Sequence, residues 1–193
     1  MNRILEEMTD EKLMLECQKD NLEAFNLLFR RYEKRLYNFS FRFVGDRLSA
    51  EEITLDTFMR VYRARKRYQP TARYSTWIYS IAINLCRDFS KAKSKDKVIS
   101  ESIYELNLVA DTQNNPDEKT LEEELKLKVM KAINSLPQKQ RKVIIMSYYE
   151  GLTYPEIASI LRCSHASVKM AAHRAYLKLR KLLSEYVMEG MKK

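Results

Sequence analysis

The chain has 193 residues, a formal net charge of +9 and a hydrophobic fraction of 45%. This length leaves room for one or two domains, and the positive charge makes nucleic acid the natural partner. The three cysteines lie far apart and form no Cys-x-x-Cys pair, which argues against a disulfide framework and a zinc site. Neither a signal peptide nor a run of about 18 apolar residues is present, so we expect a reduced, cytoplasmic chain without membrane insertion.

The first predicted element is a long helix. Only three glycines and four prolines occur in the chain, which favours long helices over turn-rich sheets. Apolar residues recur every three or four positions from Leu22 to Phe43, as on one face of a helix. Gly45 is placed to end this helix, because glycine adopts the left-handed conformation at helix ends without steric cost.

Two further helices are predicted in the first half of the chain. Ser49 and Glu52 have the spacing of a capping box, so a helix is expected to begin there. Pro70 interrupts the pattern, which makes residues 66–74 a loop. Ser75 is then the predicted N-cap of the next helix.

Charge divides the chain into three parts. Residues 57–87 and 157–184 contain no acidic residue, whereas residues 100–125 are strongly acidic and include a polar cluster that breaks helices. We therefore predict an all-α fold of two helical domains joined by a flexible acidic linker, with a helix-turn-helix in the second domain. The predicted parts, in chain order, are residues 8–95, 96–116 and 117–187.

The clearest motif is this helix-turn-helix, a short helix followed by a break and a longer basic helix. Thr153 and Glu156 have capping-box spacing, and Pro155 suits the first helical turn. Residues 162–164 break the first helix, and Ser164 is the predicted N-cap of the second. The second helix of such a motif enters the DNA major groove, and residues near its start reach the bases. The candidates for DNA contact are Ser167, Lys169, Met170, His173, Arg174 and Lys178.

A second constellation mixes aromatic residues with cations between residues 66 and 91. Aromatic rings stack on unpaired bases and cations hold the strand's phosphates, so this pattern indicates single-stranded DNA. The side-chain amide of Asn84 suits a base edge because it donates and accepts at once. Two plainer interpretations stay open: the apolar members pack in the core, and the basic run 60–67 is a solvated face. The candidate residues are Tyr68, Arg73, Tyr74, Asn84, Arg87 and Lys91.

Nothing in the sequence indicates catalysis. The two histidines, His165 and His173, have no partners at the spacing of a catalytic triad or a metal site, and no glycine-rich phosphate loop occurs. We therefore expect no enzyme activity, no cofactor, no metal and no small-molecule substrate.

Taken in order, these motifs resemble the extracytoplasmic-function (ECF) RNA polymerase sigma factors, group IV of the sigma-70 family. The resemblance covers nearly the whole chain, and the ordered set is more specific than any single motif. The segments that carry it are Ala24-Phe25, Arg31-Tyr32, Ala50–Phe58, Trp77–Asn84 with Asp88, Leu136-Pro137, Arg141, Glu156–Ala158 and Val168-Lys169.

The resemblance implies a transcription initiation factor whose partners are bacterial core RNA polymerase, promoter DNA and an anti-sigma factor. Residues 8–95 would be region 2, which binds the polymerase clamp and opens the minus-ten element with the aromatic and basic candidates above. Residues 117–187 would be region 4, whose helix-turn-helix reads the minus-thirty-five element. The linker would thread along the polymerase, or would be a charged spacer that contacts nothing. The implied polymerase-binding residues are Glu51, Glu52, Leu55 and Asp56.

The chain departs from the family pattern at several of these positions. Leu55 stands where the family usually has glutamine, which makes one polymerase contact apolar. Met170-Ala171-Ala172 replaces the frequent Ser-Arg-Leu, so promoter preference does not carry over from relatives. The family commonly has arginine after the aspartate that corresponds to Asp88, whereas this chain has Ser90-Lys91. The acids at residues 51–56 also have a plainer interpretation, as charges favoured by the dipole of a helix N-terminus.

Other functions remain possible at this point. The main alternative is a stand-alone helix-turn-helix regulator that binds duplex DNA without polymerase, although residues 66–91 have no use in it. A basic amphipathic helix at 165–183 could lie on a membrane surface, but its cations lie among alanines rather than tryptophan or phenylalanine. An RNA-binding chaperone fits the charge alone and leaves the capped helix-turn-helix unexplained.

Overall fold

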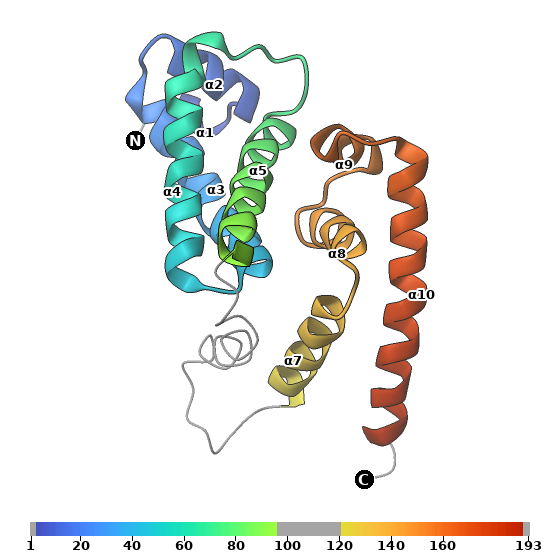
Figure 1. Cartoon of the computed structure of the whole chain (residues 1–193). Helices are drawn as coiled ribbons and strands as arrows, with labels where there is room; N and C mark the ends of the chain where they lie inside the picture. The colour runs from blue at the N-terminus through green and yellow to red at the C-terminus, as the bar shows by residue number, and fades with distance from the viewer. Residues whose placement is uncertain (1–2, 96–120, 191–193) are drawn as a thin grey trace. The chain divides into compact units, whose positions relative to one another are not determined.

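The computed structural model describes residues 3–95 and 121–190, and all regular structure in these ranges is helical (Figure 1). The chain divides into two compact units, Met1–Tyr104 and Glu105–Lys193. The predicted all-α class is therefore confirmed. The predicted linker, residues 96–116, lies outside the described residues. None of the described helices has the length and apolar character needed to cross a membrane.

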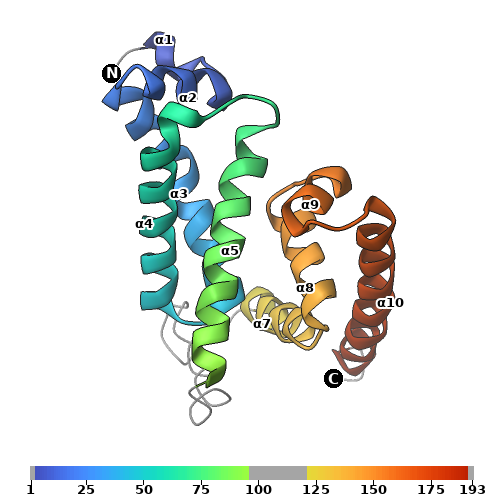
Figure 2. The same cartoon turned by 45° about the horizontal axis from the view of Figure 1, so that its top comes forward.

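The first unit is a helical bundle with α3 at its centre. Helix α3 packs against α2, α4 and α5, and α4 also packs against α5. Figures 1 and 2 show α2 at the end of the bundle where the chain passes from α4 to α5. The elements are α1 (Arg3–Glu6), α2 (Asp10–Gln18), α3 (Leu22–Val44), α4 (Arg47–Ala64), the 3-10 turn η1 (Arg65–Arg67) and α5 (Tyr74–Lys95).

Helix α3 confirms the long helix predicted from apolar spacing. The side chain of Asn21 caps its start by accepting a hydrogen bond from the Ala24 amide at 3.2 Å. Gly45 follows its end with φ 69, and the Gly45 amide donates to the Phe41 carbonyl at 2.8 Å. The residues that α3 buries are Ala24, Leu28, Tyr32, Leu36, Phe39, Ser40, Phe41, Phe43 and Val44.

The start of α4 differs from the prediction. The N-cap is Asp46, whose carboxylate accepts from the Ser49 amide at 2.8 Å. The predicted capping box of Ser49 and Glu52 is wrong, because Ser49 already lies within the first turn. The left-handed turn at Gly45 reverses the chain, so the helix begins as soon as Asp46 can cap it.

The start of α5 also differs. Helix α5 begins at Tyr74, so Ser75 is inside the helix rather than its cap. The Tyr74 amide donates to the Glu11 carboxylate of α2 at 2.8 Å. This first amide is thus satisfied by a distant side chain, which the local pattern around Ser75 does not reveal.

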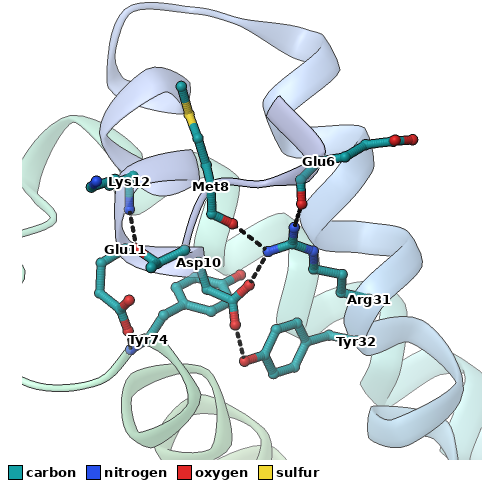
Figure 3. Close-up of polar contacts among 9 residues, drawn as sticks. Glu6, Met8, Asp10, Glu11, Lys12, Arg31, Tyr32 and Tyr74 are labelled. Atoms are coloured by element: carbon teal, nitrogen blue, oxygen red, sulfur yellow. Dashed lines mark hydrogen bonds and ion pairs between the residues drawn. The ribbon is translucent and has the colours of Figure 1, made fainter. Parts of the chain in front are cut away.

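An ion-pair network ties the N-terminal segment to α3, as Figure 3 shows. The Arg31 guanidinium donates to the Asp10 carboxylate at 2.6 Å and to the carbonyls of Met8 and Glu6 at 2.9 and 2.7 Å. The Tyr32 hydroxyl donates to the other oxygen of Asp10 at 2.5 Å. Asp10 therefore joins the start of α2 to two consecutive residues of α3.

In the second unit, α10 packs against α7, α8 and α9. Helix α8 begins after Pro137 and continues into the π-helical turn η2, and Gly151 follows with φ 67. The elements are α7 (Leu121–Asn134), α8 (Gln138–Ile144), η2 (Ile145–Tyr149), α9 (Tyr154–Leu161) and α10 (His165–Gly190).

Candidate nucleic-acid interface

Helices α9 and α10 form the predicted helix-turn-helix. The Thr153 amide donates to the Glu156 carboxylate at 2.8 Å, which confirms the predicted capping box. Arg162 ends α9 in the left-handed conformation, with φ 51 and ψ 51. The Ser164 hydroxyl then accepts from the Ser167 amide at 3.2 Å, so Ser164 is the N-cap of α10 as predicted.

One face of α10 carries most of the DNA-contact candidates. Lys169, Met170, His173 and Arg174 are all exposed, and they form two adjacent pairs four residues apart, which places them on one stripe of the helix. Val168, Ala172 and Ala175 are buried and attach the opposite face to the second unit. The arrangement therefore presents two cations, a thioether and an imidazole to a partner.

The other two candidates on α10 contact residues of their own unit. The Ser167 hydroxyl, which is half-buried, accepts from the Lys139 ammonium at 2.6 Å. The Lys178 ammonium donates to the Ser135 carbonyl at 3.1 Å. These contacts bring Lys139 of α8 beside the start of α10, a cation that local pattern reading missed because it lies 28 residues away in sequence.

The aromatic candidates Tyr68 and Tyr74 lie inside the first unit. Tyr68 is 6% exposed and Tyr74 is 0% exposed. Their ring centroids are 6.3 Å apart, and the Trp77 ring lies 4.9 Å from Tyr68 and 6.0 Å from Tyr74. In this state neither tyrosine offers a ring face to a base. They anchor the two ends of a loop whose intervening residues, 69–73, are exposed.

The chemistry of these phenols reflects the same burial. Burial raises the pKa of Tyr68 to about 12, and the carboxylates of Glu11 and Asp10 add to this effect. Burial also raises the pKa of Tyr74 well above its ordinary value of 10.0. Both rings are therefore neutral, apolar supports at physiological pH.

Asn84, Arg87 and Lys91 follow one stripe of α5. Asn84 is half-buried, whereas Arg87 and Lys91 are exposed, and the Arg87 guanidinium lies 3.7 Å from the Asp88 carboxylate. Arg73 is exposed just before the helix begins. Because a helix rises 1.5 Å per residue, Arg73 and Asn84 are separated by about 16 Å along α5. The structure thus arranges these candidates along a track, not around one compact pocket.

Several cations of the basic run 60–67 are paired with carboxylates. Asp20 accepts from Arg65 at 2.9 Å and from Lys66 at 2.6 Å. Hydrogen bonds from Lys66 and Arg65 lower the pKa of the Asp20 carboxyl group. The Arg60 guanidinium lies 3.2 Å from Asp56. The run is therefore partly neutralised within the protein, and Arg63 is among its exposed members.

The residues implied in polymerase binding lie on α4. Glu51, Glu52 and Leu55 are exposed, and Asp56 is partly covered by its pairing with Arg60. An open groove of about 580 Å³ runs beside them between α3 and α4. Its lining residues are Phe29, Glu33, Lys34, Tyr37, Glu51, Thr54 and Leu55.

The same face of α4 carries Leu55 together with two apolar residues, Leu48 and Met59, that sequence reasoning missed. Leu48 is 76% exposed, Leu55 58% and Met59 49%. They fall seven and four residues apart, a spacing that places them on one helix face. The sequence shows that spacing, but apolar residues at this spacing also mark a helix face that is buried in the core. Only exposure distinguishes the two cases, and exposure depends on what packs against α4.

The described residues contain no cluster of three or more histidine, cysteine, aspartate or glutamate side chains placed to hold a metal ion. What the first unit offers is a groove with acidic and apolar borders, an exposed loop and a basic helical track. The second unit offers a capped helix-turn-helix with an exposed basic stripe. Together these are features of a protein that binds both DNA and a protein partner.

Comparison with known families identifies the class. Residues 28–95 match the family model for sigma-70 region 2, and residues 126–179 match the model for sigma-70 region 4. The first match spans the groove, the loop and α5, and the second spans the helix-turn-helix.

Curated relatives narrow the class further. The chain is 31% identical over 179 residues to the ECF RNA polymerase sigma-E factor of Escherichia coli K12, covering 88% of this chain and 92% of the relative. It is 26% identical over 193 residues to the RNA polymerase sigma-H factor of Pseudomonas aeruginosa, covering 97% of this chain and 100% of that protein. The chain therefore belongs to the ECF sigma factors of the sigma-70 family.

Solved structures share the fold. CnrH, in complex with the cytosolic domain of CnrY, superposes with a TM-score of 0.68 at 22% identity, over 91% of this chain and 97% of that one. The sigma factor RpoE of Bartonella quintana, in complex with the anti-sigma factor NepR, gives a TM-score of 0.65 at 22% identity, over 84% and 98%.

Proposed function

We propose that this chain is a transcription initiation factor that binds bacterial core RNA polymerase, directs it to specific promoters and helps to open the minus-ten element. The observation that carries this function is the presence of both sigma-70 regions, in order, on a chain 31% identical to a sigma factor over 88% of its length. A stand-alone regulator is not favoured, because such a protein has no need of region 2.

We assign residues 8–95 to polymerase binding and promoter opening, and residues 117–187 to recognition of the minus-thirty-five element. The charge map and the two compact units support this division. The acidic linker at 96–116 would join them. A protein that acts on bacterial RNA polymerase would work in the cytoplasm, and we propose that location for this chain.

For the minus-ten element, the proposed contacts come from the exposed loop and the track on α5. Arg73, Arg87 and Lys91 would hold phosphates, and Asn84 would read a base edge. Tyr68 and Tyr74 would support the loop from the interior of the first unit, since their rings are buried. A base would reach either ring only if the loop moved.

For the minus-thirty-five element, α10 would enter the major groove with Lys169, Met170, His173 and Arg174 toward the bases. The exposed stripe supports this orientation. Ser167 and Lys178 would contact phosphate only by sharing or exchanging their contacts with Lys139 and Ser135.

For core polymerase, the proposed surface is the exposed face of α4 with Glu51, Glu52, Leu55 and Asp56. Acidic side chains suit a basic partner and repel DNA. The complexes described for CnrH and for RpoE of B. quintana suggest that an anti-sigma factor also binds this chain. Such a partner would compete with polymerase if it covers the α4 surface.

Run-off transcription with bacterial core polymerase and a library of promoter sequences tests this function. We expect start sites that depend on the added chain and share two conserved elements. DNA binding without polymerase, together with no sigma-dependent transcript, would instead support the stand-alone regulator.

A further inference from the structure

The exposed loop between α4 and α5 is held at both ends by the same helix, α2. At its start, the Gln18 side-chain amide donates to the Tyr68 carbonyl at 2.6 Å. At its end, the Glu11 carboxylate accepts from the Tyr74 amide at 2.8 Å, and Figure 3 shows Glu11 reaching the backbone there. Both contacts are to main-chain groups, so they restrain the path of the loop whatever its side chains are.

The geometry of α2 suits this role. Glu11 and Gln18 are about two turns apart, on one face of the helix and about 10 Å apart along its axis. Both side chains are half-buried, so water competes weakly for their hydrogen bonds. Helix α2 therefore makes one hydrogen bond to the loop backbone at each end of the loop, and the rigidity of the helix fixes the distance between these two points.

A third contact secures the entry to the loop. The Lys66 ammonium donates to the Gln18 carbonyl at 2.6 Å and to the Asp20 carboxylate at 2.6 Å. Arg65 donates to Asp20 as well, and its guanidinium lies 3.9 Å from the Tyr62 ring centroid. The turn after α2 thus fixes η1, from which the loop departs.

An element that captures an unstacked base benefits from being ordered beforehand. A mobile loop loses conformational entropy when it binds, and that loss subtracts from the free energy available to hold the base out of the duplex. Restraints on the loop backbone lower this cost without any contact to DNA.

We propose that α2 holds the loop between Tyr68 and Tyr74 in the conformation needed for promoter opening, and that Glu11 and Gln18 are positioning residues for this step. The proposal rests on the proposed function, in which residues 68–73 take part in opening the minus-ten element. It adds that the opening step depends on a helix that lies outside the segment matched by the region 2 family model, residues 28–95.

The test measures the rate of promoter opening by full-length variants bound to core polymerase. The probe is 2-aminopurine in the minus-ten element of a promoter recovered from the library selection. Gln18→Glu keeps the side-chain size but removes the donor to Tyr68, and Glu11→Ala removes the acceptor for Tyr74. Each should slow opening of duplex DNA by about five- to tenfold, as expected for the loss of one hydrogen bond.

Two comparisons separate positioning from a general loss of structure. Glu11→Gln retains an oxygen acceptor and should open the promoter at nearly the wild-type rate, and Glu7→Ala, at an exposed position before α2, should do so too. On a template with a pre-opened, mismatched minus-ten bubble, run-off transcription by Gln18→Glu and Glu11→Ala should fall less than about threefold below that of the wild type, because the unstacking cost is already met. Polymerase affinity should not change.

Arg73→Ala distinguishes failure of this proposal from failure of the proposed function. If Arg73→Ala slows opening while Gln18→Glu and Glu11→Ala do not, α2 does not position the loop for promoter opening. If Arg73→Ala also has no effect, the loop takes no part in opening and the function assigned to it fails. A defect of Glu11→Gln equal to that of Glu11→Ala, or a loss of polymerase binding by Gln18→Glu and Glu11→Ala, would also overturn the proposal.

Discussion

Among the residues that the structure describes, the non-glycine residues Asp20 and Arg162 adopt left-handed backbone conformations, with φ 64 and φ 51. Each stands where one helix ends and another begins. Aspartate tolerates this region better than most residues, and the Asp20 carboxylate also gains hydrogen bonds from Lys66 and Arg65. Arg162 has no such side-chain reason in the described contacts, and its conformation serves to turn the chain into α10.

The stripe on α10 leads to a prediction for two of its cations. Replacing both Lys169 and Arg174 with alanine should reduce promoter-directed transcription by at least about thirtyfold, since each base contact contributes about 1–3 kcal/mol. Binding to core polymerase should be unchanged. Run-off transcription and a polymerase-binding assay measure the two effects.

A matched control removes the same charge further along the helix. Arg180 and Lys181 are exposed on α10, and their double alanine variant should lose only affinity that is independent of promoter sequence. Promoter-directed transcription that survives in the Lys169 and Arg174 double variant would show that this stripe does not read the promoter.

The helix starts illustrate how local and distant caps differ. The start of α9 is capped by residues within its own first turn, and the prediction from Thr153 and Glu156 is confirmed. The start of α4 is also capped locally, but by Asp46 rather than by the predicted Ser49. The start of α5 is capped from α2 through Glu11, which no reading of neighbouring residues can reveal.

The assignment of the α4 cap can be checked by stability measurements. Asp46→Ala should lower the free energy of unfolding by about 1 kcal/mol, because the Ser49 amide loses its acceptor. Ser49→Ala should cost less, since its amide remains capped. Urea unfolding of both variants, followed by circular dichroism, makes the comparison, and equal losses would argue against Asp46 as the cap.

The first unit as a whole should be sensitive to alkaline pH. Burial raises the pKa of the Cys17 thiol from 9.0 to about 11, and that of Tyr68 from 10.0 to about 12. At a pH between the unfolded and the folded pKa of either group, that group has released its proton in the unfolded chain but still holds it in the folded chain. Stability is therefore full below about pH 9 and falls as the pH rises toward 12, by up to about 1.4 kcal/mol per pH unit for each group.

Urea unfolding at a series of pH values tests this expectation. Trp77 is the only tryptophan of the chain and lies in this unit, so its fluorescence reports on this unit alone. Cys17→Ala should flatten the decline between about pH 9 and pH 11 while leaving the part due to Tyr68. A pH profile that is the same with and without the thiol would contradict the role given to Cys17.

Much of this molecule could be predicted because the information is local. Apolar spacing and a final glycine define α3, and capping residues define the helix-turn-helix, since hydrogen bonds and burial of one face act over a few residues. The ordered motifs also led to the family. The DNA and polymerase contacts of individual residues stay predictions.

The roles of Tyr68 and Tyr74 depended on long-range packing. An aromatic residue beside cations looks the same in sequence whether its ring faces solvent or the core. Here the Tyr74 ring packs against Tyr32 of α3, both tyrosine rings pack against Trp77 of α5, and α2 holds the loop between them through Glu11 and Gln18. Burial and contacts between distant segments arise only when the helices pack together, so composition and spacing could place these residues on elements but not inside or outside the fold.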